Sequence, residues 1–177
     1  MSKNMDFEQR ARKIKLMILD CDGVLTDGGL WYDEEGRITK RFDVQDGLGI
    51  KVGQYAGLEF AVISGLDHAG VARRVKELGI RHYFPGHVRK LPILDALRAE
   101  LGIGYEEIAY MGDDWVDLTP LGRVGLPLSV PSAQPEVRAL AAWISTNPGG
   151  RGAVREAVIT ILKAQGRYEQ ALKHWRE

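Results

Sequence analysis

The sequence predicts an α/β fold, a doubly wound parallel sheet with helices on both faces. Short apolar runs alternate with stretches of helical spacing, the connections between them are short, and no linker or low-complexity tract interrupts the 177 residues. Strands that alternate with helices of about 10–15 residues are typical of βαβ units, whose strands run parallel. We therefore expect one domain over residues 1–177, a length usual for a single domain.

The apolar runs are the expected strands. The first covers residues 14–19 and ends at Asp20 and a glycine-bearing turn, as a buried strand leading into a loop does. The other expected strands cover residues 58–64, 80–84, 108–111, 126–130 and 142–145. Helical spacing separates them, in residues 47–56, 69–78, 91–101, 116–121 and 153–164. Residues 165–177 read as a polar helix or tail.

One segment, at about residues 28–44, breaks the alternation. Two β-rich runs flank a turn at Glu34-Glu35-Gly36, a pattern typical of a β-hairpin. Because it follows the first strand, this hairpin insertion should stand over the carboxyl end of the sheet. It is more apolar than a solvated ribbon should be, with Leu30, Trp31, Tyr32 and Phe42. Either another chain covers it or it packs back on its own domain.

The composition excludes several classes of protein. Lys and Arg total 24, as do Asp and Glu, so the formal net charge is zero, which argues against a nucleic-acid or anionic-membrane binder. The single cysteine, Cys21, excludes an intramolecular disulfide and a cysteine-cluster metal site. No apolar run reaches the roughly 20 residues of a membrane span, and the charged N-terminus lacks the apolar stretch of a signal peptide. We expect a cytoplasmic protein.

The aspartates gather where expected strands end. Asp20 and Asp22 follow the first strand, and Asp113, Asp114 and Asp117 follow the strand at 108–111. In an open α/β sheet, ligands bind outside the carboxyl ends of the strands. Clustered carboxylates repel one another, and a divalent cation is the usual reason to collect them. Oxygen ligands without histidine or cysteine favour Mg²⁺.

The same edge carries the residue types that phosphoryl transfer needs. Of Asp20 and Asp22, one could attack phosphorus while the other protonates the leaving group. Ser64, at the end of the second long strand, and Lys90 could neutralise and orient the phosphoryl oxygens. Each residue alone has an ordinary alternative: a turn-capping aspartate, a solvated Lys90, or Ser64 as the N-cap of a helix near Asp67. Four such elements in this chain order are hard to obtain by chance.

These residues resemble the motifs of the haloacid dehalogenase (HAD) superfamily of aspartate-nucleophile phosphatases. The four signatures match residues 20–26, Ser64, Lys90 and residues 112–117. The resemblance implies that Asp20 is the nucleophile and Asp22 the general acid and base, with Ser64 and Lys90 stabilising the phosphate. The second acid, Asp22, is the mark of phosphotransferases, since dehalogenases lack it.

The resemblance also implies a metal site. Asp113 would bind Mg²⁺ together with Asp20 and the backbone carbonyl of Asp22, and Asp114 and Asp117 would support the site from its outer shell. Beyond the superfamily, the chain is similar to the capless branch containing the 3-deoxy-D-manno-octulosonate 8-phosphate (KDO 8-phosphate) phosphatases. Residues 22–28, 40–50 and 149–156 carry this similarity, within a resemblance covering about residues 14–164.

That branch implies a particular activity and assembly. The expected reaction is the Mg²⁺-dependent hydrolysis of KDO 8-phosphate to KDO and phosphate through an aspartyl-phosphate, a step of lipopolysaccharide biosynthesis. The hairpin would pair with copies from other subunits in a homotetramer, and neighbouring subunits would replace the missing cap domain.

The sugar is less well specified than the chemistry. Arg74, ten residues after Ser64, falls on a family arginine position, and Lys40 and Arg151 are further candidates for binding the substrate, with solvated surface charge as the alternative. Leu66 departs from the arginine usual in the KDO 8-phosphate branch, and leucine makes no charge-assisted contact to an anion. A nonulosonate 9-phosphate phosphatase is therefore the alternative, and a non-catalytic oligomerisation module is a distant third hypothesis.

Overall fold

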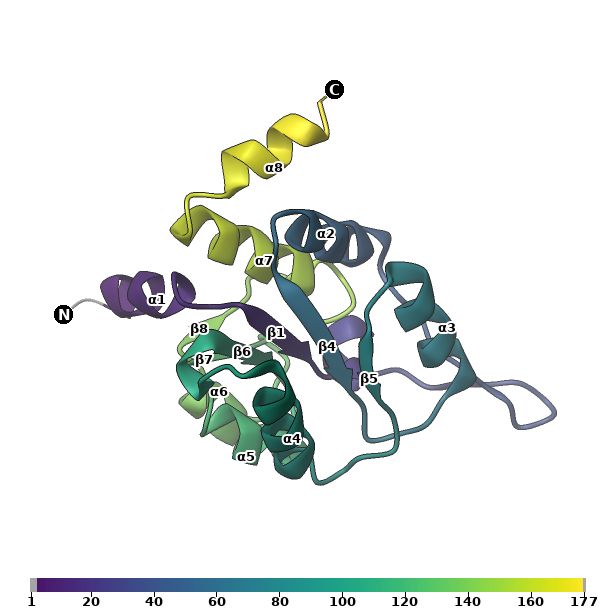
Figure 1. Cartoon of the computed structure of the whole chain (residues 1–177). Helices are drawn as coiled ribbons and strands as arrows, with labels where there is room; N and C mark the ends of the chain where they lie inside the picture. The colour runs from purple at the N-terminus through teal and green to yellow at the C-terminus, as the bar shows by residue number, and fades with distance from the viewer. Residues whose placement is uncertain (1–2, 177) are drawn as a thin grey trace.

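The computed structural model describes residues 3–176, which form a parallel sheet flanked by helices (Figure 1). The sheet has six strands in the order β5-β4-β1-β6-β7-β8, and every neighbouring pair is parallel. The strands are β1 (Leu16–Leu19), β4 (Glu59–Ile63), β5 (His82–Phe84), β6 (Ile108–Met111), β7 (Leu126–Ser129) and β8 (Trp143–Ile144). The chain order reverses between β1 and β6, so the predicted doubly wound fold is confirmed and its switch point lies there.

Two layers of helices bury the sheet (Figure 1). One face is covered by α2 (Val44–Tyr55) and α7 (Ala153–Ala164), with α3 (Ala69–Leu78) packed beside α2. The other face is covered by α4 (Leu91–Leu101), α5 (Leu118–Leu121) and α6 (Pro135–Leu140). The remaining helices are α1 (Lys3–Ala11) and α8 (Tyr168–His174), and both contact α7. Because both faces are covered, all four residues of β1 are buried, which explains its uninterrupted apolar sequence.

The contact between α2 and α7 positions the loop after β1. Asp46 of α2 is buried, and its carboxylate accepts hydrogen bonds from the amides of Gly152 (3.1 Å) and Arg155 (2.9 Å) at the start of α7. Just before α7, the amide of Gly150 donates to the carbonyl of Val24 at 2.9 Å. The start of α7 is thereby fixed against the turn at Cys21–Leu25, which follows β1.

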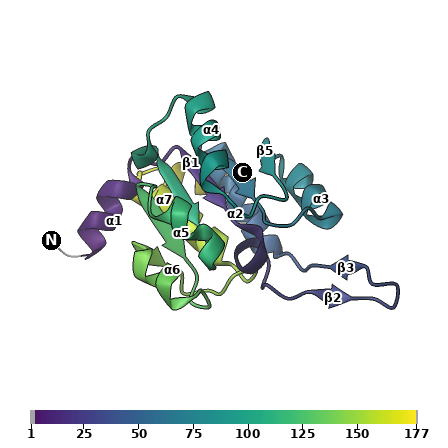
Figure 2. The same cartoon turned by 90° about the horizontal axis from the view of Figure 1, so that it is seen from below.

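The predicted hairpin is present and projects from the carboxyl end of the sheet (Figure 2). Strands β2 (Trp31–Tyr32) and β3 (Ile38–Thr39) pair antiparallel and form a separate small sheet. Trp31 is 68% exposed and Tyr32 is 64% exposed, so these aromatic side chains do not pack back on their own chain. Among residues 3–176 there is no cap domain.

Several predicted boundaries were wrong, for local reasons. Helix α2 begins at Val44, three residues before the predicted start, because the Asp43 carboxylate caps it by accepting from the amides of Gln45 and Asp46. Val44 therefore belongs to the helix and not to the hairpin insertion. The predicted helix 116–121 is a 3₁₀ turn at Trp115–Asp117 followed by the single turn of α5.

Two helices, α1 and α6, were not predicted. Residues 165–177 were expected to form a polar helix or tail, and α8 lies there. Glu177 lies outside the described residues. A further 3₁₀ turn covers Tyr105–Glu107. Within residues 3–176, every helix is too short or too polar to cross a membrane.

Candidate active site

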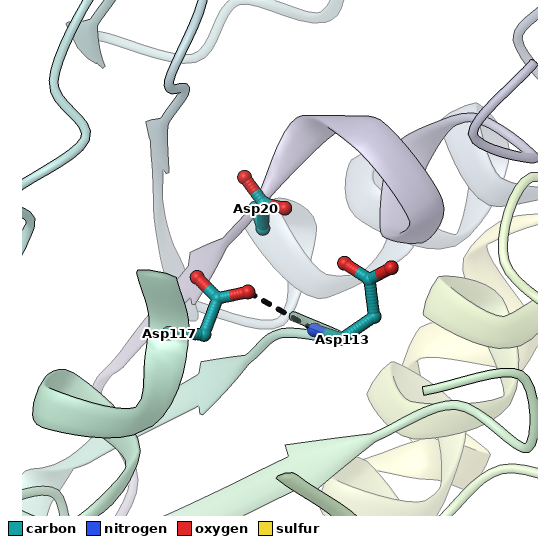
Figure 3. A group of neighbouring side chains, drawn as sticks. All are labelled: Asp20, Asp113 and Asp117. Atoms are coloured by element: carbon teal, nitrogen blue, oxygen red, sulfur yellow. Dashed lines mark hydrogen bonds between the residues drawn. The ribbon is translucent and has the colours of Figure 1, made fainter. Parts of the chain in front are cut away.

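Three aspartates meet at the switch point between β1 and β6. Asp20 directly follows β1, and Asp113 and Asp117 come from the segment after β6 (Figure 3). A carboxylate oxygen of each lies within 4.8 Å of one from each of the others. The carboxyl edge of a parallel sheet thus collects the side chains that the sequence predicted to meet there.

Lys90 contacts two of these aspartates. It immediately precedes α4, and its side chain is completely buried, so the alternative of a solvated lysine was wrong. Its Nζ donates to Oδ1 of Asp20 at 2.5 Å and to Oδ1 of Asp117 at 2.7 Å. Burial alone would lower the pKa of Lys90, but the two carboxylates outweigh burial and the pKa is raised. A fixed ammonium group therefore lies beside Asp20.

Asp117 already has a full set of hydrogen-bond donors. Its Oδ1 accepts from Lys90 and from the hydroxyl of Tyr110, both at 2.7 Å. Its Oδ2 accepts from the amides of Asp113 (3.0 Å, the dashed line in Figure 3) and Asp114 (3.3 Å). With four donors and no exposed surface, this carboxylate holds its neighbours in place.

Asp113, in contrast to Asp117, has a carboxylate oxygen without a hydrogen-bond donor. Its Oδ1 is buried and has no hydrogen-bond partner. Burial, followed by the charges of Asp20 and Asp117, raises the pKa of Asp113 to about 8. Burial and the Asp117 charge raise the pKa of Asp20 to about 7, against the opposing effect of Lys90. Two carboxyl groups here thus resist ionisation when no cation balances them.

The loop after β1 makes room for Asp113 at Gly23. A Cβ atom on Gly23 would lie 1.9 Å from Oδ2 of Asp113, and Gly23 also has a φ of +92°. Only glycine tolerates both the contact and the left-handed backbone. The sequence of the loop is therefore matched to a carboxylate at this position.

These residues fit a magnesium ion. Carboxylate oxygens are hard ligands, an unpartnered buried oxygen on Asp113 is available, and a divalent cation would relieve the repulsion that raises both pKa values. Asp20 and Asp113 are the members with oxygen atoms to offer, because the oxygens of Asp117 are committed to four donors.

Asp22 is not a member of this group of three aspartates. Its carboxylate is one-third exposed, and both of its oxygens accept from Nζ of Lys40 at 2.7 Å. Lys40 was a predicted substrate-binding residue with solvated surface charge as the alternative. Its side chain is buried, so the solvated alternative was wrong, and its charge is paired with Asp22.

Cys21, between Asp20 and Asp22 in the sequence, is buried. Burial raises the pKa of its thiol, so it remains a protonated core residue.

Ser64 and Asp114 lie at the same edge with local partners. Ser64 directly follows β4 and is buried, and its hydroxyl donates to the carbonyl of Leu66 at 2.9 Å. It is not the N-cap of α3, because that helix begins at Ala69 and His68 caps it. Asp114 caps the 3₁₀ turn after β6 by accepting from the amide of Trp115 at 2.6 Å.

The two predicted arginines lie outside the aspartate group. Arg74 on α3 donates to the carbonyl of Asp43 at 3.0 Å, next to the start of α2. Arg151 lies just before α7, is 59% exposed, and has one long ion pair of 3.7 Å with Asp27. The Leu66 side chain is 48% exposed.

Sequence reasoning missed one contributor and the partner of another. Tyr110 was assigned only to a strand, yet its buried hydroxyl bonds Asp117. A phenol on a strand that is otherwise apolar is a signal that could have been used, because a buried hydroxyl needs a partner. Lys40 was noticed, but its pairing with Asp22 depends on how the hairpin returns, which has no signature in the sequence.

Comparisons with known proteins agree with this fold. No protein-family profile matches the chain. A solved HAD-superfamily (subfamily III A) hydrolase from Legionella pneumophila is 42% identical, with a TM-score of 0.95 over 98% of this chain and 95% of that one. The fold and the carboxylate site together thus define a hydrolase of the HAD superfamily.

Two further relatives identify the family within this superfamily. The 3-deoxy-D-manno-octulosonate 8-phosphate phosphatase KdsC of Haemophilus influenzae is 41% identical over 160 residues, which cover 90% of this chain and 89% of that protein. The corresponding phosphatase of Moraxella catarrhalis, solved in complex with magnesium, phosphate and KDO, is 42% identical with a TM-score of 0.94 and covers 96% of this chain and 98% of that one. The chain belongs to the KdsC family of phosphatases.

Proposed function

We propose that this protein is a Mg²⁺-dependent phosphatase that hydrolyses KDO 8-phosphate to KDO and phosphate. The observation that carries the proposal is the group of Asp20, Asp113 and Lys90, in which both carboxyl groups have raised pKa values and the Lys90 ammonium is fixed against Asp20. The activity of the KdsC relatives and the ligands of the Moraxella catarrhalis structure support the substrate and the metal.

The positions of the side chains support a two-step reaction. A carboxylate oxygen of Asp20 attacks phosphorus, forming an aspartyl-phosphate, while Asp22 protonates the leaving sugar oxygen. Asp22 then takes a proton from the water that hydrolyses this intermediate. Lys90 and Ser64 hold the phosphoryl oxygens, and catalysis depends mainly on this positioning and on charge stabilisation.

Asp20, Asp113 and the backbone carbonyl of Asp22 would hold Mg²⁺, and Asp114 and Asp117 would keep the ligands in place. When bound, Mg²⁺ supplies positive charge that offsets the carboxylates and the phosphate. Arg151, with its exposed guanidinium and single long ion pair, is a candidate for the sugar-acid carboxylate, together with Arg74.

A substrate panel tests the proposal. We expect kcat/KM to be highest for KDO 8-phosphate among KDO 8-phosphate, a nonulosonate 9-phosphate and generic sugar phosphates. The nonulosonate ester belongs in the panel because exposed Leu66 replaces the family arginine. If KDO 8-phosphate is hydrolysed no better than generic esters, the substrate assignment is wrong. Hydrolysis of none of them would favour a non-catalytic oligomerisation module.

We also propose that the protein is a cytoplasmic homotetramer assembled through the hairpin. The exposed Trp31 and Tyr32 side chains support this, because an apolar ribbon in water is a usual sign of a covered surface. Sedimentation should give the tetramer mass for the wild type and a smaller mass for Trp31→Ser. The control Trp175→Ser, at an exposed tryptophan of the C-terminal helix region, should keep the tetramer mass. A wild-type monomer would contradict the assembly.

A further inference from the structure

Lys40 buries its ammonium group against the loop that carries the acids. It follows β3, where the hairpin returns toward the sheet, and its side chain is 0% exposed. Its Nζ lies 2.7 Å from each carboxylate oxygen of Asp22. A buried ammonium is costly unless it is paired and hydrogen-bonded, so this contact fixes the Lys40 side chain.

Asp22 depends on the same contact. Among the residues that the structure describes, Lys40 is the only hydrogen-bond donor to the Asp22 carboxylate. The backbone of Asp22 is in a loop conformation (φ −82°, ψ 115°), and a third of its side chain is exposed. Without Lys40, no hydrogen bond from residues 3–176 would hold this carboxylate in one rotamer.

The root of the hairpin is fastened to the loop after β1 independently of Lys40. Thr26 and Phe42 form an antiparallel β-bridge that joins the two ends of the insertion. The carbonyl of Ile38 lies 2.9 Å from Nε2 of His68, the residue that caps α3. These contacts fix the backbone on both sides of Lys40, so its side chain is delivered to Asp22 from a rigid base.

We propose that Lys40 is a positioning residue that holds the Asp22 carboxyl group in the orientation for proton transfer to and from the reacting oxygens. This inference rests on the proposed function. In the first step the bond between phosphorus and the leaving oxygen breaks, a bond from Asp20 to phosphorus forms, and a proton passes from Asp22 to the leaving oxygen.

In the second step water oxygen bonds to phosphorus, the bond from Asp20 breaks, and a water proton passes to Asp22. Lys40 neither gives nor takes a proton in either step. Its role is geometric, and it replaces the substrate contact expected from the sequence, because its Nζ is buried against both oxygens of Asp22.

Dependence on the leaving group separates this role from a merely structural one. An alkyl alkoxide must be protonated as it leaves, whereas p-nitrophenolate leaves without help. For Lys40→Met we expect kcat on KDO 8-phosphate to fall roughly 10- to 100-fold, because part of the usual contribution of general acid catalysis is lost. We expect kcat on p-nitrophenyl phosphate to change little. The double variant with Asp22→Asn should lose no more on KDO 8-phosphate than Asp22→Asn alone. Arg37→Met, at a residue of the same hairpin whose side chain is 73% exposed, is the control and should resemble the wild type.

Equal losses on the two esters would overturn the proposal, as would additive losses in the double variant. If the wild type hydrolyses other alkyl phosphates but not KDO 8-phosphate, the substrate assignment fails and the Lys40 comparison is made on the best alkyl ester. Crystal structures of the wild type and of Lys40→Met test the role of Lys40 without an activity measurement. We expect one Asp22 rotamer in the first and several in the second, and a single unchanged rotamer in Lys40→Met would contradict the inference.

Discussion

Gly23 is the residue at which backbone conformation and site geometry are both constrained. An alanine there would cost roughly 1–2 kcal/mol for its left-handed backbone, and its Cβ would overlap the Asp113 carboxylate, 1.9 Å from Oδ2. For Gly23→Ala we expect the Mg²⁺ concentration for half-maximal activity to rise roughly 10- to 100-fold, as when other supports of a metal ligand are lost. A metal titration of the phosphatase rate measures this.

Gly36→Ala is the matched control. Gly36 also has a positive φ, +76°, but no atom lies within 4 Å of a Cβ built on it. Its alanine variant should have a similar backbone penalty and an unchanged Mg²⁺ requirement. If both variants raise the Mg²⁺ requirement equally, the contact with Asp113 is not the cause.

The raised pKa values of Asp20 and Asp113 predict how stability depends on pH. An aspartate carboxyl group in water has an ordinary pKa of 3.8, and the fold raises the pKa to about 7 in Asp20 and about 8 in Asp113. The folded, metal-free protein therefore holds protons that the unfolded chain releases, and this contribution to stability is present below about pH 4 and lost as the pH rises through 7 to 8. Mg²⁺ binds the ionised form, so its stabilising effect should grow over the same range.

Thermal unfolding in EDTA and in Mg²⁺, at about pH 5.5 and about pH 8, checks this expectation. We expect the increase in Tm caused by Mg²⁺ to be larger at the higher pH. Asp113→Asn should remove most of that increase at both pH values. A Tm increase of the same size at both pH values in the wild type would contradict the assignment of these carboxyl groups to the metal.

At the scale of elements, the pairing of α2 with α7 carries a polar contact as well as apolar packing. Asp46→Ala would leave the amides of Gly152 and Arg155 without their acceptor, and an unsatisfied buried donor costs about 1–3 kcal/mol. Part of that loss is offset because burial of the Asp46 carboxylate, which raises its pKa, is relieved. We expect urea denaturation to give a loss of about 2 kcal/mol in the free energy of unfolding.

Asp33→Ala is the comparison for this measurement. Asp33 also accepts from two amides, those of Glu35 and Arg37, but it lies in the exposed hairpin turn. Water replaces its contacts, so we expect a loss within about 0.5 kcal/mol. Losses of equal size in the two variants would show that the burial of these contacts at the start of α7 does not determine how much the free energy of unfolding falls.

The elements also show why sequence reasoning succeeded unevenly. The central strands were predicted because strands buried on both faces are uninterrupted apolar runs, as in β1. The start of α2 was misplaced because the Asp43 cap was not used as a signal, although aspartate is a favoured N-cap. Helix α6 is a single short segment that begins at Pro135, too brief for a periodic pattern.

For the molecule as a whole, the chain order of the site residues was predictable and their mutual contacts were not. A parallel sheet brings every strand's carboxyl end to one edge, so Asp20 and Asp113 could be expected to meet. Which carboxylate is saturated and which is free depends on partners such as Tyr110, which only the folded chain supplies. The pairing of Lys40 with Asp22 likewise depends on the path of the hairpin.

The site at the carboxyl edge of the sheet supports one central hypothesis, that Asp20 is the nucleophile of a metal-dependent phosphatase. Phosphate release by the wild type and by Asp20→Asn, in Mg²⁺ and in EDTA, tests it most directly. Asparagine keeps the size of the side chain but replaces one carboxylate oxygen with an amide nitrogen and removes the negative charge, and circular dichroism checks that the variant is folded. We expect the wild type to be active only in Mg²⁺ and Asp20→Asn to be slower on the order of 10³-fold or more. Equal phosphate release by the two proteins in Mg²⁺ would contradict the mechanism.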